Sequence, residues 1–292
     1  MLGGMPRRLL VDTSSLLYRA FYALPRTLVD DAGAPTGALR GYLDMLARVL
    51  RDRGPSEVIH VFDAAERPAA RVAAWPGYKA AREAMPDELS AQFVRLREIL
   101  GLLGASVATA PGWEADDAIA ALTAATPTGS DVEILTGDRD LLQLVRDGDP
   151  QVRVLWTRRG VADLDVLDAA AVEERYGVAP ERYADYATLR GDPSDGLPGV
   201  RGIGEVTAGR LLARHGTLEG ILAAGADLTA GQRRNLDAAH DYLEAMQEVV
   251  PVRRDVEVTV DTGTPAAEVL EDLAERGGFS GPLRRLRAAM VG

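Results

Sequence analysis

The chain has 292 residues, and its contents of 47% hydrophobic and 26% charged residues are ordinary for a globular protein. It contains no cysteine, which excludes disulfide bonds, zinc–thiolate sites and cysteine nucleophiles. No apolar run reaches the roughly 18 residues that a membrane helix needs, so we expect a cytoplasmic protein with no membrane contact that acts as a monomer. The net charge of −11 argues against a nucleic acid partner, unless many of the acids gather in one metal site.

The first half of the chain alternates between short apolar runs and segments with apolar residues at helical spacing. Strands are predicted at 8–12, 57–63, 106–110, 132–138 and 152–157. Helices are predicted after residue 12, with Thr13 or Ser14 as cap, at 37–51, at 87–103 with Asp87 as cap, at 114–125 and at 139–145. This alternation predicts an α/β core over residues 1–168, built on a central, mostly parallel sheet flanked by helices.

From about residue 170 the pattern becomes helical, so we expect a second part over residues 169–292. A glycine-rich turn at 199–204 separates two predicted helices, and Gly216 is a good signal for the end of the second one. A further strand is predicted at 254–260.

Acidic residues gather in five short motifs along the chain: VDTSS, FDAA, GWEADD, TGDRD and GDPSDG. They supply Asp12, Asp63, Glu114, Asp116, Asp117, Asp138, Asp140, Asp192 and Asp195. Several follow predicted strands, so they meet at one edge of a parallel sheet. Oxygen ligands without histidine or cysteine suit Mg²⁺ or Mn²⁺ and disfavour zinc. Each motif also has a simpler interpretation, as helix-capping acids or as turn residues.

The glycine-rich turn between the two predicted helices is a candidate contact for a phosphate backbone. Its glycines, Gly199, Gly202 and Gly204, permit a tight hairpin, and amides at the start of the following helix bind phosphate without reading sequence. Arg201, Arg210 and Arg214 could reinforce this contact. An ordinary turn between packed helices is the alternative.

The order of these motifs resembles the 5′→3′ exonuclease/flap endonuclease family, as in the N-terminal nuclease domain of bacterial DNA polymerase I. The resemblance covers roughly residues 8–220, through LLVDTSSLLYRAFYALP, FDAAERPAARVAAWPGYKAAR, PGWEADDAIAAL, TGDRDLLQLV and LRGDPSDGLPGVRGIGEVTAGRLL. The chain then leaves no room for a polymerase, so it resembles a stand-alone member. Gly196 and Val206 depart from the family pattern, which usually has asparagine and lysine there.

The resemblance implies a PIN-like 5′ nuclease core followed by a helix–hairpin–helix over about 185–216, with an arch at 64–86 that admits a 5′ single strand. It implies a first metal ion on Asp12, Asp63, Glu114 and Asp116, and a second on Asp138, Asp140, Asp192 and Asp195, with Asp117 shared between them or close to their ligands. It leaves room for a third divalent ion and for K⁺ at the hairpin. The residues expected to contact DNA are Tyr78, Gly199, Arg201, Gly202, Ile203, Gly204 and Arg210.

Lys79 is the one lysine among 33 basic residues, and it lies in the predicted arch. If 77–85 is helical, Lys79 and Arg82 share one face and could both contact the scissile phosphate. We therefore expect Lys79 and Arg82 to act in catalysis together with Asp12 and Asp63. Tyr78 either stacks on a displaced base or is buried in the arch.

These observations predict a structure-selective 5′ nuclease. It would hydrolyse DNA phosphodiesters at a 5′ flap, nick or 5′ end by two-metal-ion catalysis, in replication or repair. Two alternatives stay open: a PIN-like ribonuclease, and an inactive protein that binds DNA structures. A metal-dependent phosphatase is a more distant one.

Overall fold

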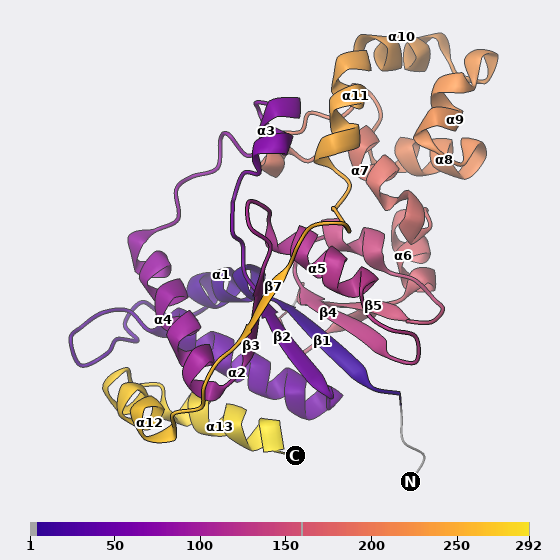
Figure 1. Ribbon diagram of the computed structural model, residues 1–292. Helices are drawn as coiled ribbons and strands as arrows, with labels where there is room; N and C mark the ends of the chain where they lie inside the picture. The colour runs from indigo at the N-terminus through magenta and orange to yellow at the C-terminus, as the bar shows by residue number, and fades with distance from the viewer. Residues whose placement is uncertain (1–4, 159, 292) are drawn as a thin grey trace.

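The structure is a computed structural model that describes residues 5–158 and 160–291 (Figure 1). Its centre is a sheet with the strand order β6-β5-β4-β1-β2-β3-β7, in which the five inner strands are parallel and the two edge strands are antiparallel. The strands are β1 (Arg7–Asp12), β2 (Glu57–Val61), β3 (Ser106–Thr109), β4 (Asp131–Thr136), β5 (Val152–Trp156), β6 (Asp165–Leu167) and β7 (Thr259–Thr262). The predicted α/β fold class is confirmed.

Alternate residues of the strands face two separate apolar cores, as period-two side-chain geometry requires. Leu9 and Val11 pack with α1 (Thr13–Ala23), α2 (Gly37–Arg53) and α4 (Asp87–Leu103) on one face. Leu10 and Ile59 pack with α5 (Ala115–Ala124) and the 3₁₀ helix η1 (Asp140–Leu144) on the other. Both faces of the central strands are therefore covered, and only the strand ends remain available for a site.

The switch in strand order places the first acids beside one another. After β1 the chain adds β2 and β3 on one side, and then β4 and β5 on the other, so the order in which strands are added reverses between β1 and β4 while the strands stay parallel. Asp12 ends β1, and Asp138 follows β4 by two residues. A crevice opens at such a point beyond the carboxyl ends of the strands, which is where ligands bind in open α/β sheets.

A helical part follows β6 and lies beyond that edge of the sheet (Figure 1). Its helices are α6 (Ala169–Tyr176), α7 (Tyr183–Arg190), α8 (Glu205–His215), α9 (Leu218–Ala223), α10 (Ala230–Ala238) and α11 (His240–Val249), with the short 3₁₀ turns η2 (Pro180–Arg182), η3 (Pro193–Asp195) and η4 (Gly225–Asp227). Gly216 ends α8, as predicted. A β-carbon on Gly199 would lie 2.4 Å from the Arg190 carbonyl oxygen, so the hairpin requires glycine there.

The last segment of the chain returns from the helical part to the sheet. β7 pairs with β3, while α12 (Ala267–Arg276) and α13 (Ser280–Val291) pack on the core that contains α2. The Arg285 guanidinium donates to Asp44 of α2 at 2.8 Å. The described residues after 168 therefore include a strand of the central sheet as well as helices, and the division at residue 168 stays a prediction.

Several predicted boundaries need correction. The N-cap of α1 is Asp12, whose carboxylate accepts from the Ser15 amide, so neither Thr13 nor Ser14 caps it. Pro86 occupies the N-cap of α4, which makes Asp87 its first residue. The helix predicted at 139–145 is the 3₁₀ helix η1 (Asp140–Leu144) instead of an α-helix. The predicted strand at 254–260 is confirmed only at its end, where β7 begins at Thr259.

The segment 64–86 is mostly irregular and contains one short helix, α3 (Ala69–Ala74). Residues 77–85 are not helical, and Lys79 has a φ of +51°. Within the described part of the chain, no helix is both long and apolar enough to cross a membrane.

The contribution of the C-terminal helices to the core can be measured with Phe279, which is completely buried. We expect Phe279→Ala to lower the free energy of unfolding by about 3–5 kcal/mol, because it leaves a cavity between α12, α13 and α2. Val269→Ala, at a residue that is 57% exposed on α12, is the control and should change it by less than about 0.5 kcal/mol. Urea unfolding measures both, and equal effects would contradict this packing.

Candidate active site

A cleft of about 920 Å³ opens at the carboxyl ends of β1, β2 and β4. Five of the predicted metal ligands line it: Asp12, Asp63, Glu114, Asp116 and Asp138. Its other walls come from α1, from α4 and from the segment 79–85. The topology therefore brings acids from four separate motifs to one opening.

Asp12 and Asp63 are fixed by short hydrogen bonds to their surroundings. Asp12 is buried, and its carboxylate accepts from the Ser15 amide at 3.0 Å and from the Thr136 hydroxyl at 2.6 Å. Asp63 accepts from the Ala115 amide at 2.8 Å and from the Ser14 hydroxyl at 2.5 Å. These bonds orient the two carboxylates before any ligand arrives.

The start of α5 carries a buried ion-pair network. Glu114 and Asp117 cap the helix reciprocally, and Arg71 of α3 donates to both side chains. The Arg71 side chain is only 3% exposed. The Tyr78 hydroxyl also donates to Glu114, at 2.8 Å. Sequence reasoning gave no role to Arg71, although Pro68, three positions earlier, is a signal for the start of a helix such as α3.

Asp117 does not face the cleft. One of its oxygens accepts from Arg71 at 2.7 Å and from the Arg253 amide at 2.9 Å, and the other accepts from Arg71 at 2.9 Å. The side chain is fully buried. Asp117 therefore holds Arg71 and the helix start in place beside Glu114, and it does not line the cleft.

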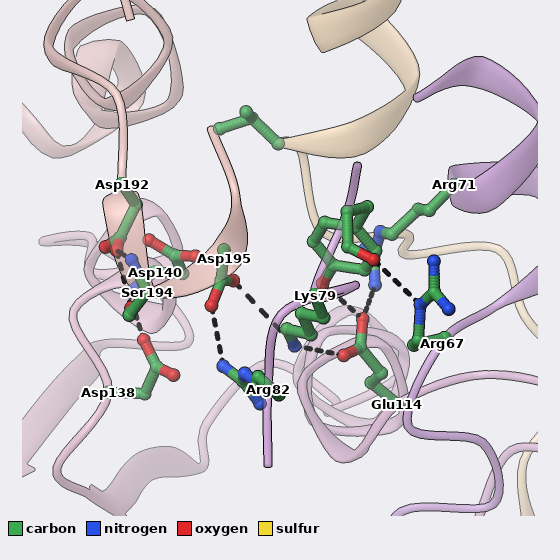
Figure 2. A network of polar contacts seen from close by, with 12 residues as sticks. Arg67, Arg71, Lys79, Arg82, Glu114, Asp138, Asp140, Asp192, Ser194 and Asp195 are labelled. Carbon is green, nitrogen blue, oxygen red and sulfur yellow. Dashed lines mark hydrogen bonds and ion pairs between the residues drawn. The ribbon is translucent and has the colours of Figure 1, made fainter. Parts of the chain in front are cut away.

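The acids form two groups. The first comprises Asp12, Asp63, Glu114 and Asp116, and the second comprises Asp138, Asp140, Asp192 and Asp195, which Figure 2 shows on the other side of Lys79 from Glu114. The Asp140 amide donates to Asp138 at 2.8 Å, which sets the turn after β4. Asp192 accepts from the amide and the hydroxyl of Ser194, at 3.0 and 2.6 Å. The 3₁₀ turn η3 thus presents Asp192 and Asp195 toward the sheet edge.

The two predicted catalytic cations lie between these groups, although the helix expected to align them is absent. Lys79 forms ion pairs with Glu114 and, at 3.8 Å, with Asp195. Arg82 donates to Asp195 at 2.6 Å. Tyr78 is only 4% exposed, so of its two interpretations the structure shows burial, and its ring is not free to stack on a base.

Burial and mutual repulsion perturb the acids of the cleft. Burial raises the pKa of Asp12 to about 7, with repulsion from Asp63 and Asp138 adding to it, while hydrogen bonds from Thr136 and Ser15 act in the opposite direction. Burial likewise raises the pKa of Asp140 to about 8, and repulsion from Asp138 contributes. The pKa values of Asp116 and Asp138 are raised for the same reasons. A bound cation would relieve this repulsion.

The donor set suits hard divalent ions, because it consists of carboxylate oxygens whose charges repel one another. Among the described residues, no three acidic or histidine side chains come together closely enough to hold an ion as they stand. Two of the acids instead face cations of the segment 64–86: Glu114 contacts Arg71 and Lys79, and Asp195 contacts Arg82 and Lys79. Some rearrangement of side chains must therefore accompany metal binding.

The wall of the cleft that α1 and α4 form combines aromatic rings with arginines. Tyr18, Tyr22 and Arg19 come from α1, and Phe93 and Arg97 come from α4. Tyr22 is 69% exposed. Rings and guanidinium groups of this kind stack on unpaired bases and contact backbone phosphates. Sequence reasoning missed this wall, although the spacing of Tyr18 and Tyr22 placed them on one helix face.

The hairpin at 199–204 exposes backbone groups to solvent, while the side chain of Ile203 is buried. Ile203 is buried, and its amide donates to the Val200 carbonyl, so neither group is available to a ligand. Asn235 of α10 donates to the Arg201 carbonyl at 2.8 Å and braces the turn. Arg201 and Arg210 are exposed, and neither pairs with an acid in the described residues. Arg214 instead pairs with Asp227 at 3.4 Å.

Family models match the chain over nearly its whole length. Residues 7–177 match the model "5'-3' exonuclease, N-terminal resolvase-like domain", and residues 178–271 match "5'-3' exonuclease, C-terminal SAM fold". The chain belongs to the 5′-3′ exonuclease family. The resemblance inferred from the motifs is thereby confirmed, and the family is one of nucleases.

Relatives and solved structures agree with this assignment. The chain is 45% identical to a 5′-3′ exonuclease of Streptomyces coelicolor over 304 residues, covering 97% of this chain and 100% of that one. It is also 45% identical to the DNA polymerase I of Mycobacterium bovis over 219 residues, covering 74% of this chain and 24% of the polymerase. Two crystal structures of a bacteriophage T5 protein share the fold, with TM-scores of 0.67 and 0.64, identities of 18% and 17%, and 98% coverage of both chains.

The buried network around Arg71 makes a prediction for stability. We expect Arg71→Met to lower the free energy of unfolding by about 3–5 kcal/mol, because it leaves Glu114 and Asp117 buried without their cation. Arg276→Met breaks an exposed pair with Asp272 and should cost no more than about 1 kcal/mol. Chemical denaturation without divalent ions compares them; a loss at Arg71 no larger than at Arg276 would refute the role of the network.

The raised pKa values predict a pH dependence for the metal-free protein. Burial and repulsion give Asp12 and Asp140 folded-state pKa values of about 7 and about 8, above the ordinary aspartate value of 3.8. Their contribution to stability is therefore fully present below about pH 4 and is lost as pH rises through 7 and 8. We expect the melting temperature in a chelator to fall between about pH 4 and pH 8 and to level off above this range.

Saturating Mg²⁺ should reduce or reverse this fall, because ligands bind metal in the ionised form. Asp140→Asn should flatten the pH dependence, while Asp272→Asn, at an exposed acid, should leave it unchanged. A melting temperature that is independent of pH over this range would contradict the prediction.

Proposed function

We propose that this protein is a structure-selective 5′ nuclease that hydrolyses DNA phosphodiesters at or near a junction between a 5′ single strand and a duplex. The observation that carries the proposal is the convergence of two acidic groups at the topological switch point, in a chain that also exposes the glycine-rich hairpin 199–204. Family membership supports the nuclease activity. One of the T5 structures is a flap endonuclease complex with DNA and metal ions, which supports DNA as the substrate.

Divalent ions, Mg²⁺ or Mn²⁺, would supply an activated nucleophile and stabilise the leaving oxygen. We propose that Asp12, Asp63, Glu114 and Asp116 hold one ion and that Asp138, Asp140, Asp192 and Asp195 hold the other. Asp117 is left out of this set because Arg71 and the Arg253 amide occupy its oxygens.

Other residues of the cleft, together with the hairpin and α8, would bind and orient the substrate. The exposed arginines Arg201 and Arg210 and the amides at the start of α8 would grip the duplex backbone without reading its sequence. The wall of Tyr18, Tyr22, Phe93, Arg19 and Arg97 would receive the unpaired 5′ strand. Lys79 and Arg82 lie at the inner end of this path, where they would contact the scissile phosphate. A K⁺ ion at the hairpin and a third divalent ion belong to the same proposal.

Cleavage mapping tests the proposal as a whole. The substrates are a 5′ flap, a nicked duplex, single-stranded DNA and single-stranded RNA, each with Mg²⁺ and with Mn²⁺. We expect cuts near the junction of the flap and at the 5′ end of the nick, with 5′-phosphate products. Preferential cleavage of RNA would favour a PIN-like ribonuclease, and junction binding with no cleavage in either ion would favour an inactive DNA-binding protein.

Single acids test the assignment of the metal ligands. We expect Asp12→Asn and Asp138→Asn each to lower the single-turnover cleavage rate by about 100-fold or more, because each removes a charged ligand from the reaction centre. Asp272→Asn removes an exposed acid from α12 and should keep the parent rate. Near-normal cleavage by either cleft variant would show that the ligand assignment is wrong.

A further inference from the structure

Lys79 lies between the two acidic groups and contacts both (Figure 2). Its ammonium pairs with Glu114 of the first group and, at 3.8 Å, with Asp195 of the second. The other cations nearby are confined to one group: Arg71 contacts Glu114, and Arg82 contacts Asp195. In the described part of the chain, Lys79 is thus the cation that links the two.

The backbone holds Lys79 in this position through close contacts with η3. Its amide donates to the Asp195 carbonyl at 2.8 Å, and its φ of +51° places it in the left-handed region that side chains seldom adopt. The Trp75 indole donates to the Gly196 carbonyl at 3.0 Å. A β-carbon on Gly196 would lie 2.2 Å from the Gly77 carbonyl oxygen, so this approach depends on glycine. Such strain persists only where the surrounding structure maintains it.

We propose that Lys79 is an internal counterion of the metal-free site, which divalent ions must displace from Glu114 and Asp195 when they bind. The inference rests on the proposed function, because it concerns the same carboxylates. Lys79 neutralises part of their charge before metal arrives, and it becomes free to face the substrate phosphate only afterwards. Lys79 can therefore contact DNA only after divalent ions have bound to the carboxylates.

The chemistry of the side chain fits this role. A lysine ammonium is a compact charge on a flexible stem, so it can leave one carboxylate without disturbing a second. Arg71 is locked by a two-pronged pair with Asp117 and cannot move in this way. The other 32 basic residues are arginines, and the one lysine stands at the position from which a cation must be released.

The experiment measures the binding of Mn²⁺ to the protein without DNA, through the spectroscopic signal of the free ion. We expect Lys79→Met to bind Mn²⁺ about tenfold more tightly than the parent, since a neighbouring charge typically changes the proton affinity of a carboxylate by one pKa unit or more. Lys79→Arg keeps a competing charge and should stay close to the parent. The control is Arg97→Met. Arg97 lines the same cleft, and its guanidinium lies over the Phe62 ring. This substitution should change the Mn²⁺ affinity less than twofold.

A Lys79→Met affinity equal to or weaker than that of the parent would overturn the inference. So would an equal gain for Arg97→Met, because it would show a general effect of charge. Lys79→Gln provides a second neutral variant if the first does not fold. As an independent readout, Ca²⁺ should raise the melting temperature of Lys79→Met more than that of the parent. Failure of the proposed function is distinguishable, since the parent would then not cleave flap DNA, whatever the Mn²⁺ affinities.

Discussion

Mutual repulsion among carboxylates is the constraint on which the rest of this structure depends. The parallel sheet ends its inner strands at one edge, and the acids that follow β1, β2 and β4 meet there with those of α5 and η3. Burial makes each charge more costly, which raises the pKa values of Asp12 and Asp140 into the neutral range. A fold that gathers acids in this way must supply positive charge, either from its own side chains or from bound ions.

The segment 64–86 supplies that charge in two forms. Arg71 is a permanent cation, buried and paired on both sides, and it fixes the start of α5. Lys79 and Arg82 contact acids that a metal ion would also need. The same segment therefore neutralises part of the acidic charge and also lines the cleft. This dual role explains why an irregular stretch is tied so closely to η3 and to α5.

The sequence predicted the sheet, the positions of the acids and the family, because these depend on short-range pattern and on strand order. It could not predict which partner each acid has. Asp117 has the same acidic helix-start context as Asp116, and only the arrival of Arg71 from α3 and of the Arg253 amide from beyond α11 turns it away from the cleft. The burial of Tyr78 and the left-handed conformation of Lys79 likewise follow from contacts with residues more than 30 positions away. Local propensity carries no information about such contacts.

The strongly negative net charge is compatible with DNA as substrate because the charges are segregated. The acids of the site occupy one crevice, where bound cations would offset them, and arginines lie on its far wall and on α8. An approaching strand would therefore meet rings and guanidinium groups at the wall before it reaches the acids. Such a surface binds through local contacts, so its affinity should be modest and sensitive to salt. In the proposed function, selectivity for a junction would follow from geometry, because the hairpin would hold duplex backbone and the wall would receive unpaired bases, so that a substrate has to offer both at once.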